Sequence, residues 1–465
     1  MEGFKIFFLI SFLSIVGSNS FAQVFNGDIN TSTIINSNSH TPFWIWANQL
    51  GHIPQNSKFI QTGEINLELK NHFKNGNTFF MATKAFGSKG EVSHFELTEL
   101  YVGFKLGRII ASVGSRADSL IQEGLSSSNG NFLNSRNAKP YPRISLDTDG
   151  FIKIGKRNFS IAGKWEEGIL LDERMVDKPR LHHKNLLFRI GDVQKFQFEI
   201  GIDHYVFWGG DSPKYGPQPK GFTDYLRAIL AMRGGDQHTQ GDQDNVAGNS
   251  LGQYFFIFRK KWQNVDAEIR IIHPFEDKSG IVLFNTVDNL YSLYLTFNEN
   301  QFLKYTLLEF IYTKNQSGDD IQDGVRIHTN GRDDYLTHSF YNSGFTYFGN
   351  VMGSSLFYPI NYNSEGISTG IANNRFVAFH FGASGKLSNT LNWKMLYSYS
   401  YNYGTYWVPF DTVRNQLSGL FEFKYEFIKA HLYLKTLFAF DRGSNINNGM
   451  NDLSGGARLT VGWRL

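Results

Sequence analysis

The chain has 465 residues, 45 lysines and arginines against 42 aspartates and glutamates, and no cysteine. The net charge of +3 is too small to indicate nucleic-acid binding or a polybasic membrane anchor, and the lack of cysteine excludes disulfides and thiolate metal sites. Aromatic residues make up 16% of the chain, yet the mean hydropathy is −0.30. A membrane β-barrel reconciles these values, because it spreads aromatics over a lipid-facing band and keeps a polar lumen.

The first residues predict a secretory signal. Lys5 precedes an apolar run at residues 6–16, and small residues follow, ending at Ala22. This pattern is typical of a cleaved signal peptide at residues 1–22, with the mature chain beginning near Gln23. The apolar run is shorter than the roughly 20 residues of a spanning helix, and no later run reaches that length. A mature chain that crosses a membrane must then do so as a closed β-barrel.

Short and long connections alternate along the chain between segments with a period of two residues. The first short connection is the Asn75-Gly76 pair, a strong hairpin signal. Other short connections lie near residues 191–195, 262–264, 298–301 and 428–430. Long connections lie at residues 51–58, 88–94, 117–140, 208–250, 274–286, 315–337 and 442–454. Short turns at one end and long loops at the other are the arrangement of outer-membrane barrels, whereas the Greek-key links of a sandwich do not alternate in this way.

The alternation is clearest near the C-terminus. One face of two segments is apolar, with charged residues between: Phe421, Phe423, Tyr425 and Phe427, then Ala457, Leu459, Val461, Trp463 and Leu465. Such a pattern predicts an all-β fold, an antiparallel transmembrane barrel of about 18 strands spanning residues 23–465. The segments at 141–154, 158–170 and 354–360 are the least certain strands. A short helix is expected at residues 223–233 within the longest extracellular loop, which suggests an occluded lumen.

Several segments, in one order along the chain, resemble capsule-assembly proteins of the Wzi type as they occur in Bacteroidetes-like bacteria. The matching segments are residues 41–51, 135–143, 182–186, 201–216, 245–252, 275–280 and 331–335. The resemblance implies an 18-stranded outer-membrane barrel that acts as a lectin and holds capsular polysaccharide at the cell surface. Two features depart from the family: residues 23–40 are too short for the periplasmic helical bundle of some members, and the chain ends on Leu465 rather than an aromatic residue.

Motifs that suggest catalysis or metal binding lack the context they need. Residues 248–252 match the Gly-x-Ser-x-Gly nucleophile motif around Ser250, but a polar loop and a strand flank it instead of a strand and a helix. His182 and His183 are adjacent, so in a strand they point to opposite faces and cannot share a metal ion. We therefore expect no enzymatic activity, no metal site and no other cofactor.

The resembling segments near Trp208, Glu276 and Arg332 all fall in or beside long loops predicted to face outward. Sugars are bound by aromatic rings together with charged or amide groups, and these loops contain both. The candidate polysaccharide-binding residues are Trp208, Asp211, Tyr215, Glu276, Asp277, Arg332, Asp333 and Tyr335. A structural alternative is equally consistent with the sequence: Arg332 would pair with Glu276 or Asp211 to lock the loops, and Trp208 would belong to the aromatic girdle.

Three functions remain open. The first is an outer-membrane surface lectin that binds capsular or exopolysaccharide and supports capsule assembly or attachment. The second is a porin-like channel, and the third, less favoured, is an outer-membrane hydrolase. The expected partners are the polysaccharide, outer-membrane lipid and, during biogenesis, the barrel-assembly machinery; no nucleic acid is expected.

Single cysteines test the predicted topology, since the chain has no native thiol. A periplasmic C-terminus places loop 442–454 outside the cell and the turn at residues 75–76 inside. Asn447→Cys should therefore react with an impermeant maleimide on intact cells, and Asn75→Cys only after the outer membrane is broken. The reverse labelling would invert every loop assignment.

Overall fold

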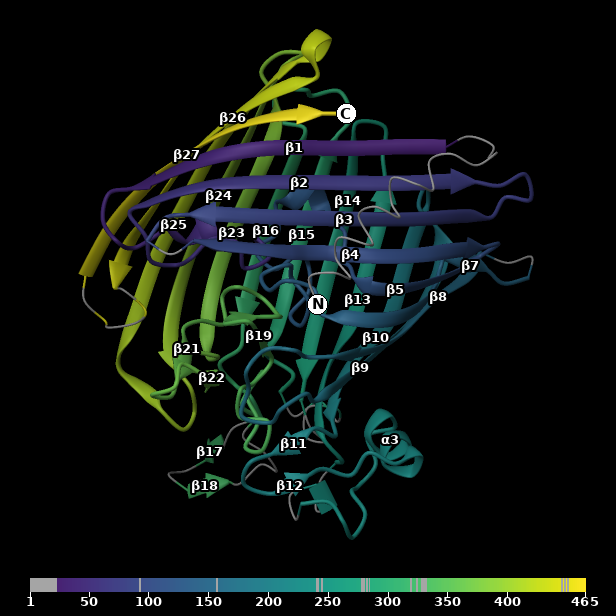
Figure 1. Cartoon of the computed structure of the whole chain (residues 1–465), viewed down its shortest axis with the longest axis vertical. Coiled ribbons are helices and arrows are strands. Elements are labelled where there is room, and N and C mark those ends of the chain that lie inside the picture. The colour runs from purple at the N-terminus through teal and green to yellow at the C-terminus, as the bar shows by residue number, and fades with distance from the viewer. Residues whose placement is uncertain are drawn as a thin grey trace.

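The computed structural model is a closed β-barrel whose strands tilt around a filled interior (Figure 1). It describes residues 23–465 except 92, 156–157, 240–241, 244–245, 277–280, 282, 284, 318–319, 323–324, 328–332, 445, 447–448 and 450. The predicted signal peptide and Asn447 lie outside the described residues. Among the described residues, no helix is long and apolar enough to cross a membrane.

One antiparallel sheet forms the wall. Its strands are β1 (Gln23–Asn36), β2 (Phe59–His72), β3 (Thr78–Lys89), β4 (His94–Leu106), β5 (Ile109–Ser115), β6 (Pro142–Thr148), β7 (Ile152–Lys153), β8 (Phe159–Ile169), β9 (Arg180–Asp192), β10 (Phe196–Trp208), β13 (Asn249–Lys261), β14 (Val265–Phe275), β15 (Asn289–Phe297), β16 (Tyr305–Tyr312), β23 (Phe376–Lys386), β24 (Leu391–Gly404), β25 (Pro409–Phe427), β26 (Leu432–Ser444) and β27 (Asn451–Arg464). Since β6 and β7 both pair with β8 as parts of one strand, the 19 strands make an 18-stranded barrel. Strand β1 closes it by pairing with β27, from Asp28 opposite Arg464 to Asn36 opposite Gly456.

The predicted fold class is confirmed. Short turns lie at one end of the barrel and the longer connections at the other, except that the connection predicted to be long at residues 88–94 is short, with only residues 90–93 between β3 and β4. The turn between β2 and β3 is tight: the Phe73 amide donates to the Asn77 carbonyl at 3.0 Å, and Gly76 takes the positive φ of +82° that a short hairpin loop needs. Of the three uncertain segments, residues 141–154 form β6 and β7, and residues 158–170 form β8. Residues 354–360 form no barrel strand; only Ile360 enters a short loop strand.

Short loop elements gather at the end of the barrel that carries the long connections, the long-loop end (Figure 1). They are the two-to-four-residue strands β11 (Asp211–Ser212), β12 (Gly216–Pro217), β17 (Asp320–Gln322), β18 (Val325–Ile327), β19 (Thr346–Tyr347), β20 (Asn350–Val351), β21 (Ile360–Tyr362) and β22 (Ser368–Ile371), and the helix α3 (Phe222–Ile229). Three further helical turns are α2 (Phe43–Trp46), η2 (Gln122–Gly124) and η3 (Ile428–Ala430). The helix expected at residues 223–233 is thus present as α3.

Alternation sorts the side chains of each strand between the outside and the lumen. In β25, Phe421, Phe423 and Tyr425 are exposed on the outer face, whereas Glu422 between them points inward to Lys394 and Lys435. The outer face is therefore an apolar belt, and the inner face carries the charges, as expected for a strand between lipid and a polar lumen.

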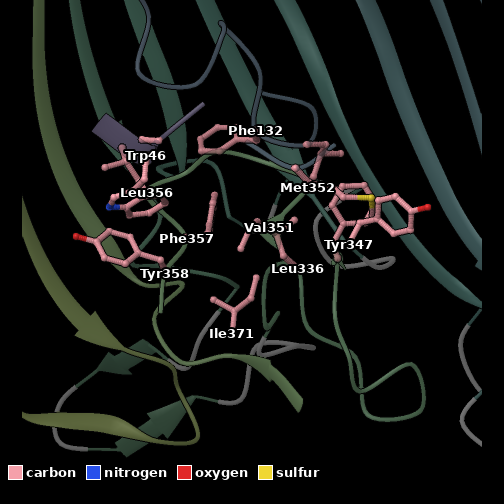
Figure 2. Packing of buried hydrophobic residues seen from close by; sticks show 14 of the residues in the cluster. Trp46, Phe132, Leu336, Tyr347, Val351, Met352, Leu356, Phe357, Tyr358 and Ile371 are labelled. Carbon is pink, nitrogen blue, oxygen red and sulfur yellow. The ribbon is translucent and has the colours of Figure 1, made fainter. Parts of the chain in front are cut away.

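Apolar residues also fill the lumen, because three long loops fold into it. They are residues 37–58, residues 116–141 and the part of loop 313–375 from residue 333 onward, and we call them the plug. Figure 2 shows their side chains packed against one another inside the barrel, among them Trp46, Phe132, Met352, Phe357 and Tyr358. The helix-bearing loop was expected to occlude the lumen, and this expectation is wrong for the helix. Helix α3 lies outside the wall, and other loops close the lumen.

Polar side chains of the wall fasten the plug. On β16, the buried carboxylate of Glu309 accepts hydrogen bonds from Ser126 Oγ at 2.6 Å, from Ser127 Oγ at 2.6 Å and from the Ser127 amide at 2.9 Å. On β26, Asp441 accepts from the Phe43 amide at 2.8 Å. These bonds satisfy loop donors that no water reaches, and they fix the plug against the wall.

Removing the Glu309 carboxylate should loosen the plug without disturbing the lipid-facing surface. Glu309→Ala leaves three donors without this acceptor, a cost of about 1–3 kcal/mol for a buried group. We expect a lower thermal unfolding temperature and faster swelling of liposomes in small sugars. Leu308→Ala, on the outward face of the same strand, is the matched control and should leave permeability unchanged. Equal swelling of both variants would show that Glu309 does not hold the barrel closed.

Candidate functional site

A cavity of about 560 Å³ opens among the loops at the long-loop end, above the plug. Loops that are far apart in the sequence contribute to it, so it exists only once the barrel has closed. Its lining combines carboxylates, two aromatic rings and many hydroxyl or amide groups: Thr239, Asp242, Val246, Gly248, Asn249, Ser250, Glu276, Asp333, Asp334, Thr337, His338, Ser339, Phe340, Asn342, Thr369 and Trp407. Hydroxyls and carboxylates beside aromatic faces are the groups that recognise sugars.

The carboxylates also hold the loops in place. Glu276 accepts a hydrogen bond from the Leu336 amide at 2.7 Å, and Asp333 accepts one from Ser317 Oγ at 2.8 Å. Asp334 accepts one from Asn374 Nδ2 at 2.5 Å. Part of the acceptor capacity of the cavity is therefore used to build its own wall.

The charge of the cavity comes from its acids. None of the described lining residues is a lysine or arginine. Burial lowers the pKa of His338 to about 4, so this imidazole is neutral near pH 7; its Nδ1 accepts hydrogen bonds from the amides of Phe340 and Tyr341, both at 3.2 Å. Burial raises the pKa of Asp242 and of Asp334. As the pH rises, Asp242 and Asp334 lose their protons and add negative charge to the cavity.

Two aromatic rings face the cavity from different loops. Trp407, between β24 and β25, is 62% exposed. Phe340 is half-buried, and the ring of Tyr215 lies 5.5 Å from it at an angle of 36°. The exposed part of such a ring can lie against the C–H side of a sugar ring.

The structure brings together only part of the predicted site. Glu276 and Asp333 line the cavity, and Tyr215 borders it through Phe340. Asp211 is exposed in β11, where its backbone pairs with Asp177. Asp277 and Arg332 lie outside the described residues. The pairing of Arg332 with Glu276 or Asp211 consequently stays a prediction.

Tyr335 is buried beneath the cavity rather than in it. Its hydroxyl donates to Asp288 Oδ2 at 2.8 Å and accepts from Asn285 Nδ2 at 2.5 Å. Burial raises the pKa of Asp288 to about 6, despite two backbone amides that donate to its carboxyl. In this arrangement Tyr335 is a support for the loops and offers no surface to a ligand.

Trp208 faces away from the cavity. Tyr205 and Phe207 on β10 pack against Phe345 of the plug, with ring centroids 5.4 and 5.6 Å apart, so alternation turns Trp208 to the outside of the wall. There it is 6% exposed, because Tyr225 of α3 covers its ring at 5.1 Å. The stacking face expected of Trp208 is thus occupied by the protein itself.

Sequence reasoning missed Trp407, Phe340, Asp242 and Asp334. A tryptophan in a polar connection between two strands, as at position 407, is a signal that was present in the sequence. The others had none, because their roles depend on which loops meet across the barrel.

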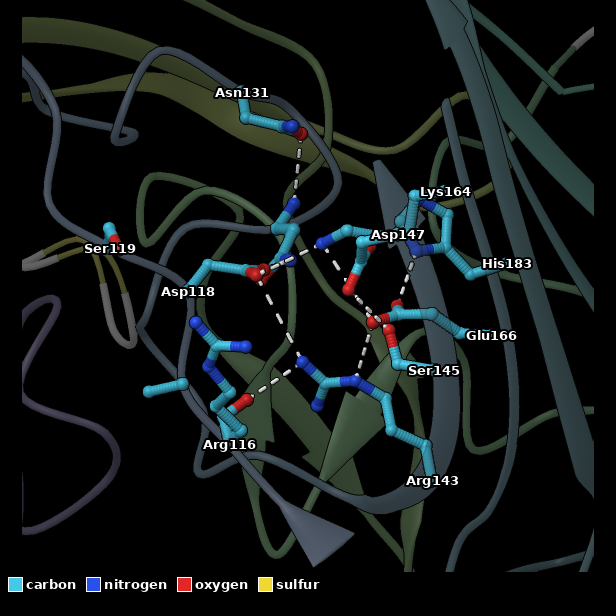
Figure 3. Close-up of polar contacts among 12 residues, drawn as sticks. Arg116, Asp118, Ser119, Asn131, Arg143, Ser145, Asp147, Lys164, Glu166 and His183 are labelled. Atoms are coloured by element: carbon cyan, nitrogen blue, oxygen red, sulfur yellow. Dashed lines mark hydrogen bonds and ion pairs between the residues drawn. The ribbon is translucent and has the colours of Figure 1, made fainter. Parts of the chain in front are cut away.

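A second polar cluster is buried in the lumen, where it joins the wall to the plug (Figure 3). Glu166 on β8 contacts Arg143 Nε at 2.8 Å and His183 Nδ1 at 2.6 Å, and Lys164 reaches Asp118 of the plug at 3.3 Å. His182, next to His183, instead packs outside the wall against Trp165. The prediction that the two histidines point to opposite faces is confirmed. The cluster is a fastening for loop 116–141, comparable to that made by Glu309.

Neither a protein-family model nor a curated protein matches this chain in sequence. Solved structures do match in fold. Wzi from Escherichia coli, an outer membrane protein involved in group 1 capsule assembly and described as a carbohydrate-binding β-barrel, aligns with a TM-score of 0.58 at 12% identity, over 93% of this chain and 83% of Wzi. OccK5 (OpdH) of Pseudomonas aeruginosa aligns with a TM-score of 0.50 at 10% identity, over 96% and 99%. OpdQ of the same organism gives 0.50 at 8% identity, over 95% and 97%. At these identities the likeness is one of fold: this chain has the architecture of outer-membrane β-barrels.

Proposed function

We propose that the protein is a surface lectin of the outer membrane, which binds capsular or exopolysaccharide in the cavity at the long-loop end and supports attachment of that polymer to the cell. One observation carries the proposal. A cavity lined by hydroxyls, carboxylates and aromatic rings lies next to the plug, which closes the barrel lumen. The carbohydrate binding described for Wzi, a barrel of similar fold, supports the same reading. This proposal places the long-loop end of the barrel outside the cell.

A porin-like channel is the second candidate, favoured by the likeness to OccK5. Against it stands the plug: Trp46, Phe132 and Phe357 are almost fully buried inside the barrel, and hydrogen bonds to the wall hold the loops that carry them. A diffusion channel needs a continuous water-filled path lined by polar groups. The packed apolar centre favours retention of a ligand at the surface over its passage.

A hydrolase has one structural feature in its favour. Ser250 Oγ and His204 Nε2 lie 2.6 Å apart, as in a nucleophile–base pair. However, Ser250 lies within strand β13 rather than at a strand–helix turn, and no carboxylate of the described residues hydrogen-bonds to His204. We therefore propose a binding protein without catalytic activity.

Substitution of the exposed ring tests the lectin proposal. Trp407→Ala should weaken binding of the cell's own surface polysaccharide by roughly tenfold, because the stacking surface is worth about 1.5 kcal/mol. Trp262→Ala removes a similarly exposed tryptophan at the short-turn end and should bind normally. Affinity and liposome swelling are measured on the same purified proteins. Normal binding by Trp407→Ala together with substrate-selective swelling would instead support the channel.

Acidification should weaken glycan binding. The pKa of Asp242 and of Asp334 is raised, so these carboxyls take up protons at a higher pH than ordinary aspartates and become uncharged, weaker acceptors for sugar hydroxyls. We expect affinity to fall between about pH 7 and about pH 4. The double substitution Asp242→Asn with Asp334→Asn should bind more weakly at neutral pH and show a flatter profile. An unchanged profile would separate these acids from the binding site.

A further inference from the structure

Helix α3 lies on the outside of the barrel wall, beside the long-loop ends of β9 and β10 (Figure 1). Its inner side packs on outward-facing residues of these strands: Ala228 and Tyr225 form a cluster with Val206 and Trp208. Tyr225 also donates a hydrogen bond to Glu167, and Lys184 of the wall donates one to the carbonyl of Ile229. The helix is therefore fixed to the wall, and its position does not depend on the plug.

A second apolar stripe of α3 remains uncovered. Phe222, Leu226 and Leu230 are 75%, 36% and 61% exposed, although they are spaced by four residues and so lie on one side of the helix. Arg227 lies about 100° around the helix from Leu226 and on the side away from the wall-facing residues. The helix thus has three sides: one on the wall, one apolar and open, and one polar.

The open stripe continues a surface that faces lipid. On the strands that carry α3, the outward residues nearer the short-turn end are exposed and apolar, among them Leu186, Ile200 and Ile202. The change from this belt to the polar residues His182, Lys184 and His204 marks the level at which α3 is attached. An amphipathic helix at that level occupies the boundary between acyl chains and headgroups.

Three basic residues lie near α3, whose first turn also carries the acidic Asp224. Lys220 precedes the helix, Arg233 follows it, and both are exposed. Arg180 on β9 is also exposed, with its guanidinium 4.7 Å from the ring of Trp208. Basic residues at the edge of an apolar helical face attract anionic headgroups.

We propose that α3 is a docking site for a phosphorylated glycolipid of the outer leaflet. Its acyl chains lie against Phe222, Leu226 and Leu230, and Arg180 and Lys220 hold its phosphates. This inference rests on the proposed location of the long-loop end outside the outer membrane. The bound glycolipid attaches the barrel to the membrane surface beside the glycan cavity. The loops that form the cavity are then held at a fixed height above the lipid headgroups.

Spin labels on single cysteines test the proposal, since the native chain has none. Labelled Leu226→Cys, Arg227→Cys and Leu186→Cys proteins are reconstituted in vesicles of phosphatidylethanolamine with rough lipopolysaccharide. We expect the label at position 226 to collide with oxygen and to be shielded from a water-soluble nickel chelate, as at position 186 in the belt. The label at position 227 should be open to the chelate. Chelate access at 226 with shielding at 186 would overturn the inference alone, whereas access at 186 would overturn the membrane location.

The charges are tested separately. The triple variant Arg180→Ala, Lys220→Ala, Arg233→Ala should bind lipopolysaccharide roughly fivefold more weakly for each charge removed, but bind phosphatidylcholine vesicles as the native protein does. Lys195→Ala with Lys429→Ala, at the short-turn end, is the control and should retain full lipopolysaccharide binding. Unchanged binding by the triple variant, or disulfide-linked dimers through Leu226→Cys in membranes, would overturn the proposal, the latter in favour of a second copy on the stripe.

Discussion

The pairing of β1 with β27 is the constraint on which the rest of this structure depends. A strand inside a bilayer has no water to satisfy its amides and carbonyls, so an open sheet edge at that depth is prohibitively costly. Here the two ends of the described chain pair side by side, from Asp28 with Arg464 to Asn36 with Gly456, and no edge of the wall is left over. Closure also gives every strand an inside and an outside, and alternation then assigns each side chain to one of them.

Closure creates a second problem, the hollow that an 18-stranded ring encloses. Ion pairs line much of that hollow, yet its centre is filled with aromatic and aliphatic side chains from three loops. Apolar packing supplies the attraction, while Glu309, Asp441 and Glu166 supply directional bonds that determine where each loop sits. Loop 313–375 takes part in both the plug and the cavity wall, since Leu336 packs in the core and its amide binds Glu276. The sequence suggested two roles for Glu276, one in fixing the loops and one in binding a ligand. A single side chain can serve both roles.

The features that the sequence predicted correctly are those that depend on residues close together in the chain. Alternation identified the lipid face of β25, and the Asn75-Gly76 pair identified a hairpin, because both are set by residues close in the chain. The site was predicted less well. Trp208 was assigned to a loop, but it is the last residue of β10, where a shift of one position exchanges lumen for outside. Tyr335 was assigned to a surface, but its partner Asp288 is 47 residues away, and no local pattern shows that contact.

The composition of the cavity bears on which polymers it can hold. Desolvating four carboxyls together is unfavourable, and the raised pKa of Asp242 and Asp334 shows that burial already opposes their ionisation. A polymer of uronic acids would add negative charge beside Asp242 and Asp334, whereas neutral or amino sugars would not. Arg180, Lys220 and Arg233 lie near α3, outside the wall. The two proposals thus place a neutral glycan and an anionic lipid on opposite sides of the same strands.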